Sequence, residues 1–213
     1  MTAEMTMTRS FSIRWATGVV VLGLLGACAT KQPKVVSAAP AAPLTAPYQG
    51  VFISLCSELT PGLYYADALN LKPKDERFVS AAYTKVFFLS PNCEASSRLI
   101  KFDMPEGSWE VIGQTLIDGK HIDQVIVNLV VGQLKGEIYN PAQVKETADS
   151  YVITFGENNK HSLPLQKETA ASIDKELRLI ENGRLHMSDA GAPPSPDGFP
   201  TFLLPPEDGF VKQ

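Results

Sequence analysis

Residues 109–131, WEVIGQTLIDGKHIDQVIVNLVV, decide the fold class of this chain. The stretch holds two runs rich in β-branched and other apolar residues, 109–117 and 121–131, and Asp118-Gly119 separates them. An Asp-Gly pair favours a tight hairpin turn, because both residues tolerate the positive φ that such a turn requires. The stretch therefore predicts two long antiparallel strands.

Two further hairpins are predicted from the same combination of alternating apolar residues and polar turns. They pair residues 177–180 with 184–187 around Asn182-Gly183, and residues 151–155 with 161–165 around the turn 157–160. Pro164 lies in the last of these runs and cannot donate a backbone hydrogen bond. It therefore places that strand at a sheet edge or at a bulge.

The other strands are predicted at residues 63–71, 78–89 and 98–104, although the run 78–89 fits a helix or a strand. A short helix is predicted at 142–148, after Asn140-Pro141, and another at 170–177. About eight strands spaced by roughly 10–15 residues predict a mainly β chain. We expect a single antiparallel domain, a small barrel or a sandwich, with one or two short helices.

The N-terminal segment has the pattern of a secretory signal peptide. Arg9 and Arg14 make its start positive, and residues 15–25 carry no charge. This run is about half the roughly 20 residues that a membrane-spanning helix needs, so such a helix is not favoured. The run ends in Leu25-Gly26-Ala27-Cys28, which resembles the lipobox of bacterial lipoproteins.

This resemblance implies cleavage before Cys28, diacylation of its sulfur and, usually, acylation of the new amine. Ala29 follows in place of an aspartate, which resembles sorting to the outer membrane. Stable anchoring takes at least two lipid signals, so the acyl chains would hold the protein persistently. We expect a lipid-anchored protein of the bacterial cell envelope, in the outer membrane and facing the periplasm. A cleaved signal peptide with a chance cysteine is the alternative.

Without Cys28 the chain retains Cys56 and Cys93, an even pair in an exported protein. Exported domains lie where disulfides persist, so the pair predicts a disulfide that closes a loop of about 37 residues. Two buried thiols or a metal pair are the alternatives. The absence of a CxxC spacing makes the metal pair a weak signal.

Composition divides the chain into four parts. Residues 1–27 are the expected signal peptide, and residues 28–47 are the lipid anchor with an Ala- and Pro-rich tether that reaches roughly 55 Å if extended. Residues 48–189 are the β-domain, and residues 190–213 are a Pro- and Gly-rich C-terminal segment. Large apolar residues in that segment favour packing on its own domain over docking on another envelope protein. They are Phe199, Phe202, Leu203, Leu204 and Phe210.

A second resemblance concerns the β-domain. The order of features is an early cysteine, Gly62-Leu63-Tyr64, a later cysteine, a strand with Trp109 and Val111, and serial hairpins. This order resembles the small lipocalin-like or calycin-like β-barrel lipoproteins of bacterial envelopes, although lipocalins have tryptophan where Tyr64 stands. The resemblance implies a barrel that carries a small apolar ligand.

The chain lacks the motifs of nucleotide-binding loops, hydrolase elbows and zinc proteases. We therefore expect no catalytic residue, metal or cofactor. His121 and Asp123 share one face of a strand, either as a functional pair or as a solvated strand end. His161 follows a polar turn and His186 alternates with apolar neighbours, so both are expected in solvent.

The charge of the chain argues against two classes of partner. The formal net charge is -4, and loss of Arg9, Arg14 and Glu4 with the signal peptide would make it about -5. With no basic block, nucleic acid and anionic lipid headgroups are not expected as main partners.

The run 125–131 is apolar on both faces. Core packing explains this, and so does a barrel strand with a ligand on its inner side. Asn128 interrupts the run and needs a hydrogen-bond partner if it is buried. Three functions remain: a non-catalytic module that binds or helps assemble another envelope component, a lipocalin-like carrier of a small apolar ligand, and an envelope enzyme. We expect the first.

Overall fold

The computed structural model describes residues 43–189, 191 and 193–213. The expected signal peptide, the lipobox with Cys28 and most of the expected tether lie outside the described residues. The described residues fall within one compact unit, Pro40–Gln213. This part is mainly β, as predicted, and its paired strands are antiparallel.

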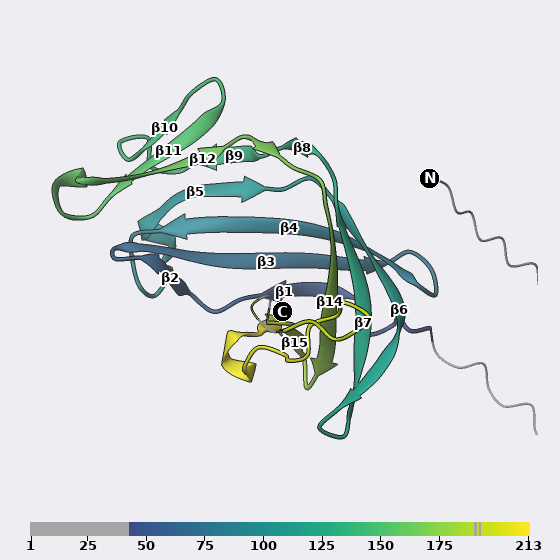
Figure 1. Ribbon diagram of the computed structural model, residues 1–213. Helices are drawn as coiled ribbons and strands as arrows, with labels where there is room; N and C mark the ends of the chain where they lie inside the picture. The colour runs from purple at the N-terminus through teal and green to yellow at the C-terminus, as the bar shows by residue number, and fades with distance from the viewer. Residues whose placement is uncertain (1–42, 190, 192) are drawn as a thin grey trace, which may run out of the picture. The chain divides into compact units, whose positions relative to one another are not determined.

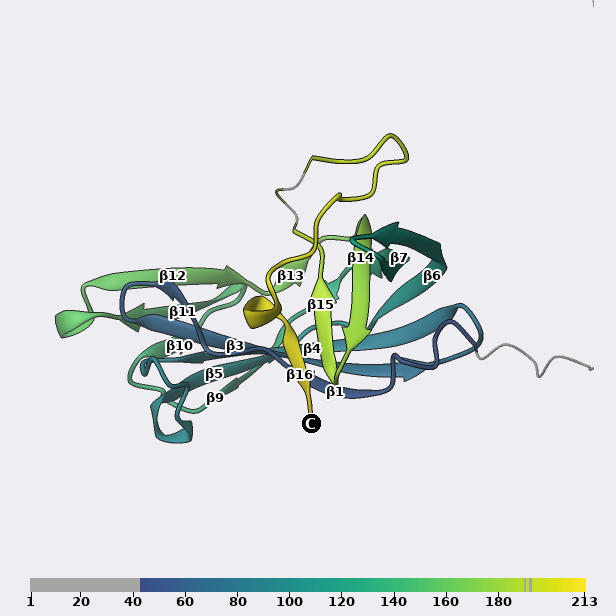
Figure 2. The same cartoon turned by 90° about the horizontal axis from the view of Figure 1, so that it is seen from below.

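Eight strands form a closed up-and-down barrel, so the barrel and not the sandwich is the correct alternative. Each strand pairs with the next in chain order, and the last pairs with the first. Figure 2 shows this closure, with β16 between β15 and β1. The barrel strands are β1 (Gly50–Ile53), β3 (Leu63–Pro73), β4 (Phe78–Phe88), β6 (Gly107–Ile117), β7 (Lys120–Leu129), β14 (Ser172–Glu181), β15 (Arg184–Met187) and β16 (Phe210–Lys212).

A second β layer adjoins the barrel, because β3 and β4 extend beyond the segments that pair with other barrel strands. Within the barrel, β3 pairs with β1 and β4 pairs with β6. Beyond the barrel, β3 pairs with β2 and β4 pairs with β5. Figure 1 shows β3 and β4 running on toward this layer. Its strands are β2 (Ser57–Thr60), β5 (Arg98–Asp103), β9 (Lys135–Ile138), β10 (Val144–Glu146), β11 (Ser150–Phe155) and β12 (His161–Gln166), with the short pair β8 (Gly132–Gln133) and β13 (Glu168–Thr169) beside it.

Each layer has its own apolar core. The barrel is filled by Tyr48, Phe52, Leu69, Leu71, Val79, Ala81, Trp109, Val111, Val125, Val127, Leu185 and Phe210. The second layer buries Leu63, Phe87, Leu99, Ile100, Phe102, Val144, Tyr151, Ile153 and Phe155. Inward residues of β4 serve both cores, since Val79 and Ala81 face the barrel and Phe87 faces the second core.

The three predicted hairpins are confirmed. Asp118 and Gly119 join β6 to β7 with φ of 50° and 76°, and Asn182 and Gly183 join β14 to β15 with φ of 51° and 74°. Strand β12 pairs with β11 alone, so Pro164 lies on an edge strand as expected.

Both helix positions predicted from sequence are wrong. Residues 142–148 form a turn and then β10, because Val144 is buried in the second core and pairs with Ile153. Residues 170–177 enter β14, which pairs with β7 over seven positions. The run 78–89 is the strand β4. The described helices are single 3-10 turns: η1 (Ala95–Ser97), η2 (Glu157–Asn159) and η3 (Pro206–Asp208).

Residues outside the expected domain limits help to build the barrel. Residues 43–47, the end of the expected tether, form a turn in which the buried Thr45 hydroxyl donates a hydrogen bond to the Asp75 carbonyl. Tyr48 follows this turn and fills the closed end of the barrel with no exposed surface. At the other end of the chain, β16 supplies the strand that closes the ring.

The C-terminal segment packs on its own domain, as the sequence favoured. Phe199 is buried against Ile122 and Leu177 on the outer face of β7 and β14, and Leu203 packs beside them. Phe202 is 59% exposed, so it contributes little to this contact. The outer face of these strands is therefore covered by residues far along the chain.

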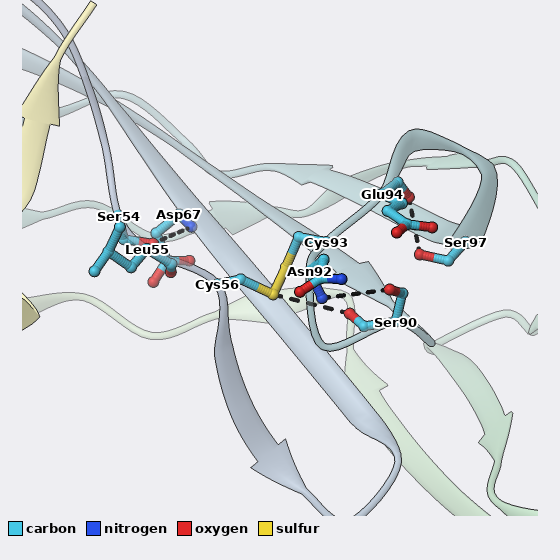
Figure 3. The surroundings of a disulfide bond; sticks show 9 residues. All are labelled: Ser54, Leu55, Cys56, Asp67, Ser90, Asn92, Cys93, Glu94 and Ser97. Carbon is cyan, nitrogen blue, oxygen red and sulfur yellow. Dashed lines mark hydrogen bonds between the residues drawn. A yellow bond between two sulfur atoms is a disulfide. The ribbon is translucent and has the colours of Figure 1, made fainter.

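Cys56 and Cys93 form a disulfide, with a Cα–Cα distance of 5.7 Å. Figure 3 shows it between the connection that leads into β2 and the loop after β4, where Ser90 and Asn92 turn the chain. The bond ties two neighbouring connections at the end of the barrel that adjoins the second layer.

Candidate functional site

A cavity of about 450 Å³ occupies the end of the barrel opposite Tyr48. We call its solvent side the mouth, formed by Met104, Pro105, Leu129, Val130, Thr169 and Ala170. These residues come from the β5–β6 connection, the end of β7 and the approach to β14. The walls and floor are formed by Leu69, Ala81, Tyr83, Lys85, Trp109, Val127, Glu176, Arg178 and Met187. Most of this lining is aliphatic or aromatic.

Arg178 is the floor of the cavity and is 2% exposed. Its guanidinium lies 5.1 Å from the centre of the Trp109 ring, a distance at which a cation and an aromatic face attract each other. The Nη1 donates to the Leu177 carbonyl at 3.1 Å, and the Nη2 contacts the Glu176 carboxylate. Burial lowers the pKa of Arg178 to about 10, so the side chain stays charged at neutral pH.

A polar network lies directly beneath this floor. The Tyr48 hydroxyl donates to Asp123 Oδ2 at 2.6 Å, and Gln114 Nε2 donates to Asp123 Oδ1 at 2.7 Å. Asp123 stands opposite Arg178 in the β7–β14 register. Burial, and then the Asp123 charge, raise the pKa of Tyr48, so its phenol stays protonated and keeps donating. The network fixes the closed end of the barrel and supports the floor.

A second ion pair lies on the wall toward the second layer. Lys85 Nζ is 3.2 Å from Asp67 Oδ1 and 4.0 Å from the centre of the Tyr65 ring. Tyr83 lines the same wall, and its pKa is raised by burial and by the nearby Asp67. The charges at this wall are therefore paired, as they are at the floor.

No protein-family model, curated protein or solved structure matches this chain.

A second hollow of about 520 Å³ adjoins the cavity and shares Tyr83 and Met187 with it. Its walls are more polar, and they include Cys56 and Asp67. The apolar cavity is the better candidate site, because ligand pockets are mostly apolar with a few placed polar groups. Among the described residues, no group of three or more His, Cys, Asp and Glu side chains is arranged to hold a metal ion. In the same part of the chain, no helix is long and apolar enough to cross a bilayer.

The sequence-predicted polar residues do not gather at the cavity. His121 and Asp123 leave β7 on the same face, but His121 is exposed at the strand end while Asp123 is buried under the floor. Asp123 bonds Tyr48 and Gln114 in place of His121. His161 is exposed at the start of β12 beside Phe155, as expected.

The expectation of a solvent-facing His186 is wrong. His186 does point to the outside of the barrel, but it is only 7% exposed because the C-terminal segment covers that face. Burial lowers the pKa of His186, so its ring is held neutral. The same cover explains how Leu177 is buried on the outside of β14.

The apolar run 125–131 divides into two parts. Val125 and Val127 fill the barrel core, whereas Val130 and Val131 follow the end of β7 at the mouth and are 48% and 63% exposed. Asn128 is half-buried and faces away from the core. Core packing therefore accounts for the first part of the run only.

Sequence reasoning missed the charged residues of the cavity, Arg178, Glu176 and Lys85. A signal was present in β14, where Glu176 and Arg178 alternate with Leu177 and Leu179. That alternation was consistent with an apolar side facing inward. The structure has the reverse: the charged side faces inward, Leu177 is buried under the C-terminal segment, and Leu179 is half-buried beside it.

Proposed function

We propose that the barrel binds one small apolar ligand in the cavity above Arg178. The supporting observation is the cavity itself, whose volume of about 450 Å³ falls within the roughly 300–1,000 Å³ of small-molecule sites. A barrel packed solidly with side chains would have argued against a carrier. The lipocalin-like alternative thus gains more support from the geometry than the assembly-accessory function or the enzyme.

The residues that line the cavity suit the binding of a ligand and do not suit catalysis. The residues that surround the cavity include no His, Cys or Ser, and its two cations each pair with a carboxylate. An apolar lining releases water when an apolar ligand enters, which supplies most of the binding free energy. We therefore propose a binding role without catalysis.

Filling the cavity tests this function. Ala81 lines the cavity and is 6% exposed, so Ala81→Phe places a ring where the ligand would lie. We expect at least a tenfold loss of affinity, about 1.4 kcal/mol, for a fluorescent apolar probe measured by titration.

Ala82→Phe is the matched control. It adds the same ring on the same strand, but side chains alternate in a strand and Ala82 faces out of the barrel. We expect it to bind the probe within about twofold of the wild-type protein. Equal affinity of the Ala81→Phe and Ala82→Phe proteins would exclude the cavity as the site.

We also propose that acyl chains on Cys28 hold this barrel on the envelope membrane. The support is the lipobox-like Leu25-Gly26-Ala27-Cys28 and the even number of remaining cysteines, whose disulfide suits an exported protein. We expect Cys28→Ala to move the protein from the membrane pellet to the soluble fraction, because one or no acyl chain gives marginal attachment. Full retention of the variant in the membrane fraction would refute the lipid anchor.

A second candidate function is the docking of another envelope component. The observation that favours it is the set of exposed apolar side chains beside the mouth, Leu129, Val130, Val131 and Ile173, which are 42–75% exposed. Such side chains mark interaction surfaces when they form a contiguous patch. Detergent extraction and co-purification distinguish the two candidates, because a carrier returns a small molecule and a docking module returns a stoichiometric protein.

A further inference from the structure

Each cation that lines the cavity forms an ion pair with a carboxylate. Arg178 contacts Glu176, and Lys85 lies 3.2 Å from Asp67. Asp123 adds another carboxylate beneath the floor, opposite Arg178 in the strand register. The single positive charge of the buried guanidinium thus faces two carboxylates, Glu176 and Asp123. An anionic ligand group would find no uncompensated positive charge at this floor.

Of the two buried floor atoms without a hydrogen-bond partner among the described residues, Glu176 Oε2 contacts Arg178 Nη2, which leaves the Arg178 Nε available to a ligand. The Nε of Arg178 finds no hydrogen-bond partner among the described residues, although the side chain is 2% exposed. A buried donor without an acceptor is costly, and an acceptor on a ligand would remove that cost. Because Arg178 lines the cavity, such an acceptor can come from a ligand that reaches the floor.

We propose that the cavity selects an apolar molecule whose inner end is a neutral hydrogen-bond acceptor, such as a hydroxyl or an ester carbonyl, over one that ends in a carboxylate. This inference rests on the proposed binding function and names the ligand class of the same cavity. A neutral acceptor satisfies the Arg178 Nε without adding a third negative charge beside Glu176 and Asp123. A carboxylate satisfies the same donor but is repelled by both carboxylates, and that repulsion is strong where water is excluded.

Glu176 is the residue that sets this preference. Its side chain is 25% exposed, so a neutral replacement at this position is tolerated more easily than one at Arg178. Glu176→Gln keeps the shape of the side chain and removes the charge that compensates the guanidinium. The substitution leaves Arg178 with a positive charge that only Asp123 opposes. A ligand carboxylate then becomes the natural partner of Arg178.

The test compares two probes of equal chain length, dodecanol and dodecanoate, by titration calorimetry at neutral pH. The protein is the full chain with Cys28→Ala, which removes the proposed acylation site. We expect dodecanol to bind at least about tenfold more tightly than dodecanoate. In the Glu176→Gln protein we expect this ratio to fall by about tenfold or to reverse.

Glu181→Gln is the matched control, because Glu181 lies on the same strand and pairs with Lys120 at the closed end of the barrel. It should leave the probe ratio unchanged. If the wild-type protein binds dodecanoate and dodecanol with equal affinity, this inference is overturned and the binding function still stands. The same holds if Glu176→Gln leaves the ratio of the two affinities unchanged. Binding of neither probe overturns the proposed function, and this inference with it.

Discussion

Replacing Arg178 with Met is expected to lower the free energy of unfolding by about 3–5 kcal/mol. Arg178 is buried, and its charge is matched by contact with Glu176 and by the face of Trp109. Removing the guanidinium leaves Glu176 without its ion-pair partner and Asp123 without the cation opposite it in the strand register. The loss of one partner from a largely buried ion pair is costly because the charge that remains is poorly solvated and has lost its counter-ion. Urea unfolding followed by circular dichroism measures this change.

Two further variants separate burial from charge pairing. Arg77→Met removes another arginine ion pair, 2.8 Å from Glu110, but the Arg77 side chain is 56% exposed. We expect that variant to lose no more than about 1 kcal/mol. The double variant Arg178→Met/Glu176→Met should recover part of the loss, because apolar residues often replace a buried ion pair without penalty. An Arg178→Met protein as stable as Arg77→Met would show that the floor contributes nothing to folding.

The features of the fold that depend on neighbouring residues were predictable. Asp118-Gly119 and Asn182-Gly183 specify their turns through local φ angles, and both hairpins form where the sequence places them. Pro164 lies on an edge strand for a similarly local reason. By contrast, closure of the ring by β16 joins residues about 160 positions apart in the chain, Phe52 and Lys212 among them. No pattern within either segment specifies that pairing.

The inward direction of β14 and β15 was not predictable from alternation alone. Alternation shows that Arg178 and Leu177 lie on opposite faces, but it does not show which face is covered. The C-terminal segment covers the outer face with Phe199 and Leu203, so Leu177 and His186 are buried outside the barrel. Arg178 therefore points inward, where its guanidinium contacts the Glu176 carboxylate and lies over the Trp109 ring. The candidate site was missed because its charged residues resembled a solvated strand face.

The disulfide gives the second large expected effect. Substituting both Cys56 and Cys93 with Ala should lower the free energy of unfolding by about 4 kcal/mol, because the bond closes a 37-residue loop and so restricts the unfolded chain. Reduction of the wild-type protein should have the same effect, whereas the double variant should not respond to reductant. Guanidinium unfolding with and without dithiothreitol measures both.

The same variant distinguishes an effect on the unfolded chain from damage to the native barrel. Neither cysteine lines the cavity, and Cys56 borders only the adjoining hollow. If the bond acts mainly on the unfolded chain, the double variant should bind an apolar probe within about twofold of the wild-type affinity while it unfolds at lower denaturant. Loss of both stability and binding would instead mean that the disulfide holds β3 and β4 in the position that shapes the wall of the cavity. Unchanged stability on reduction would contradict the prediction, because the two connections would then be held together without the bond.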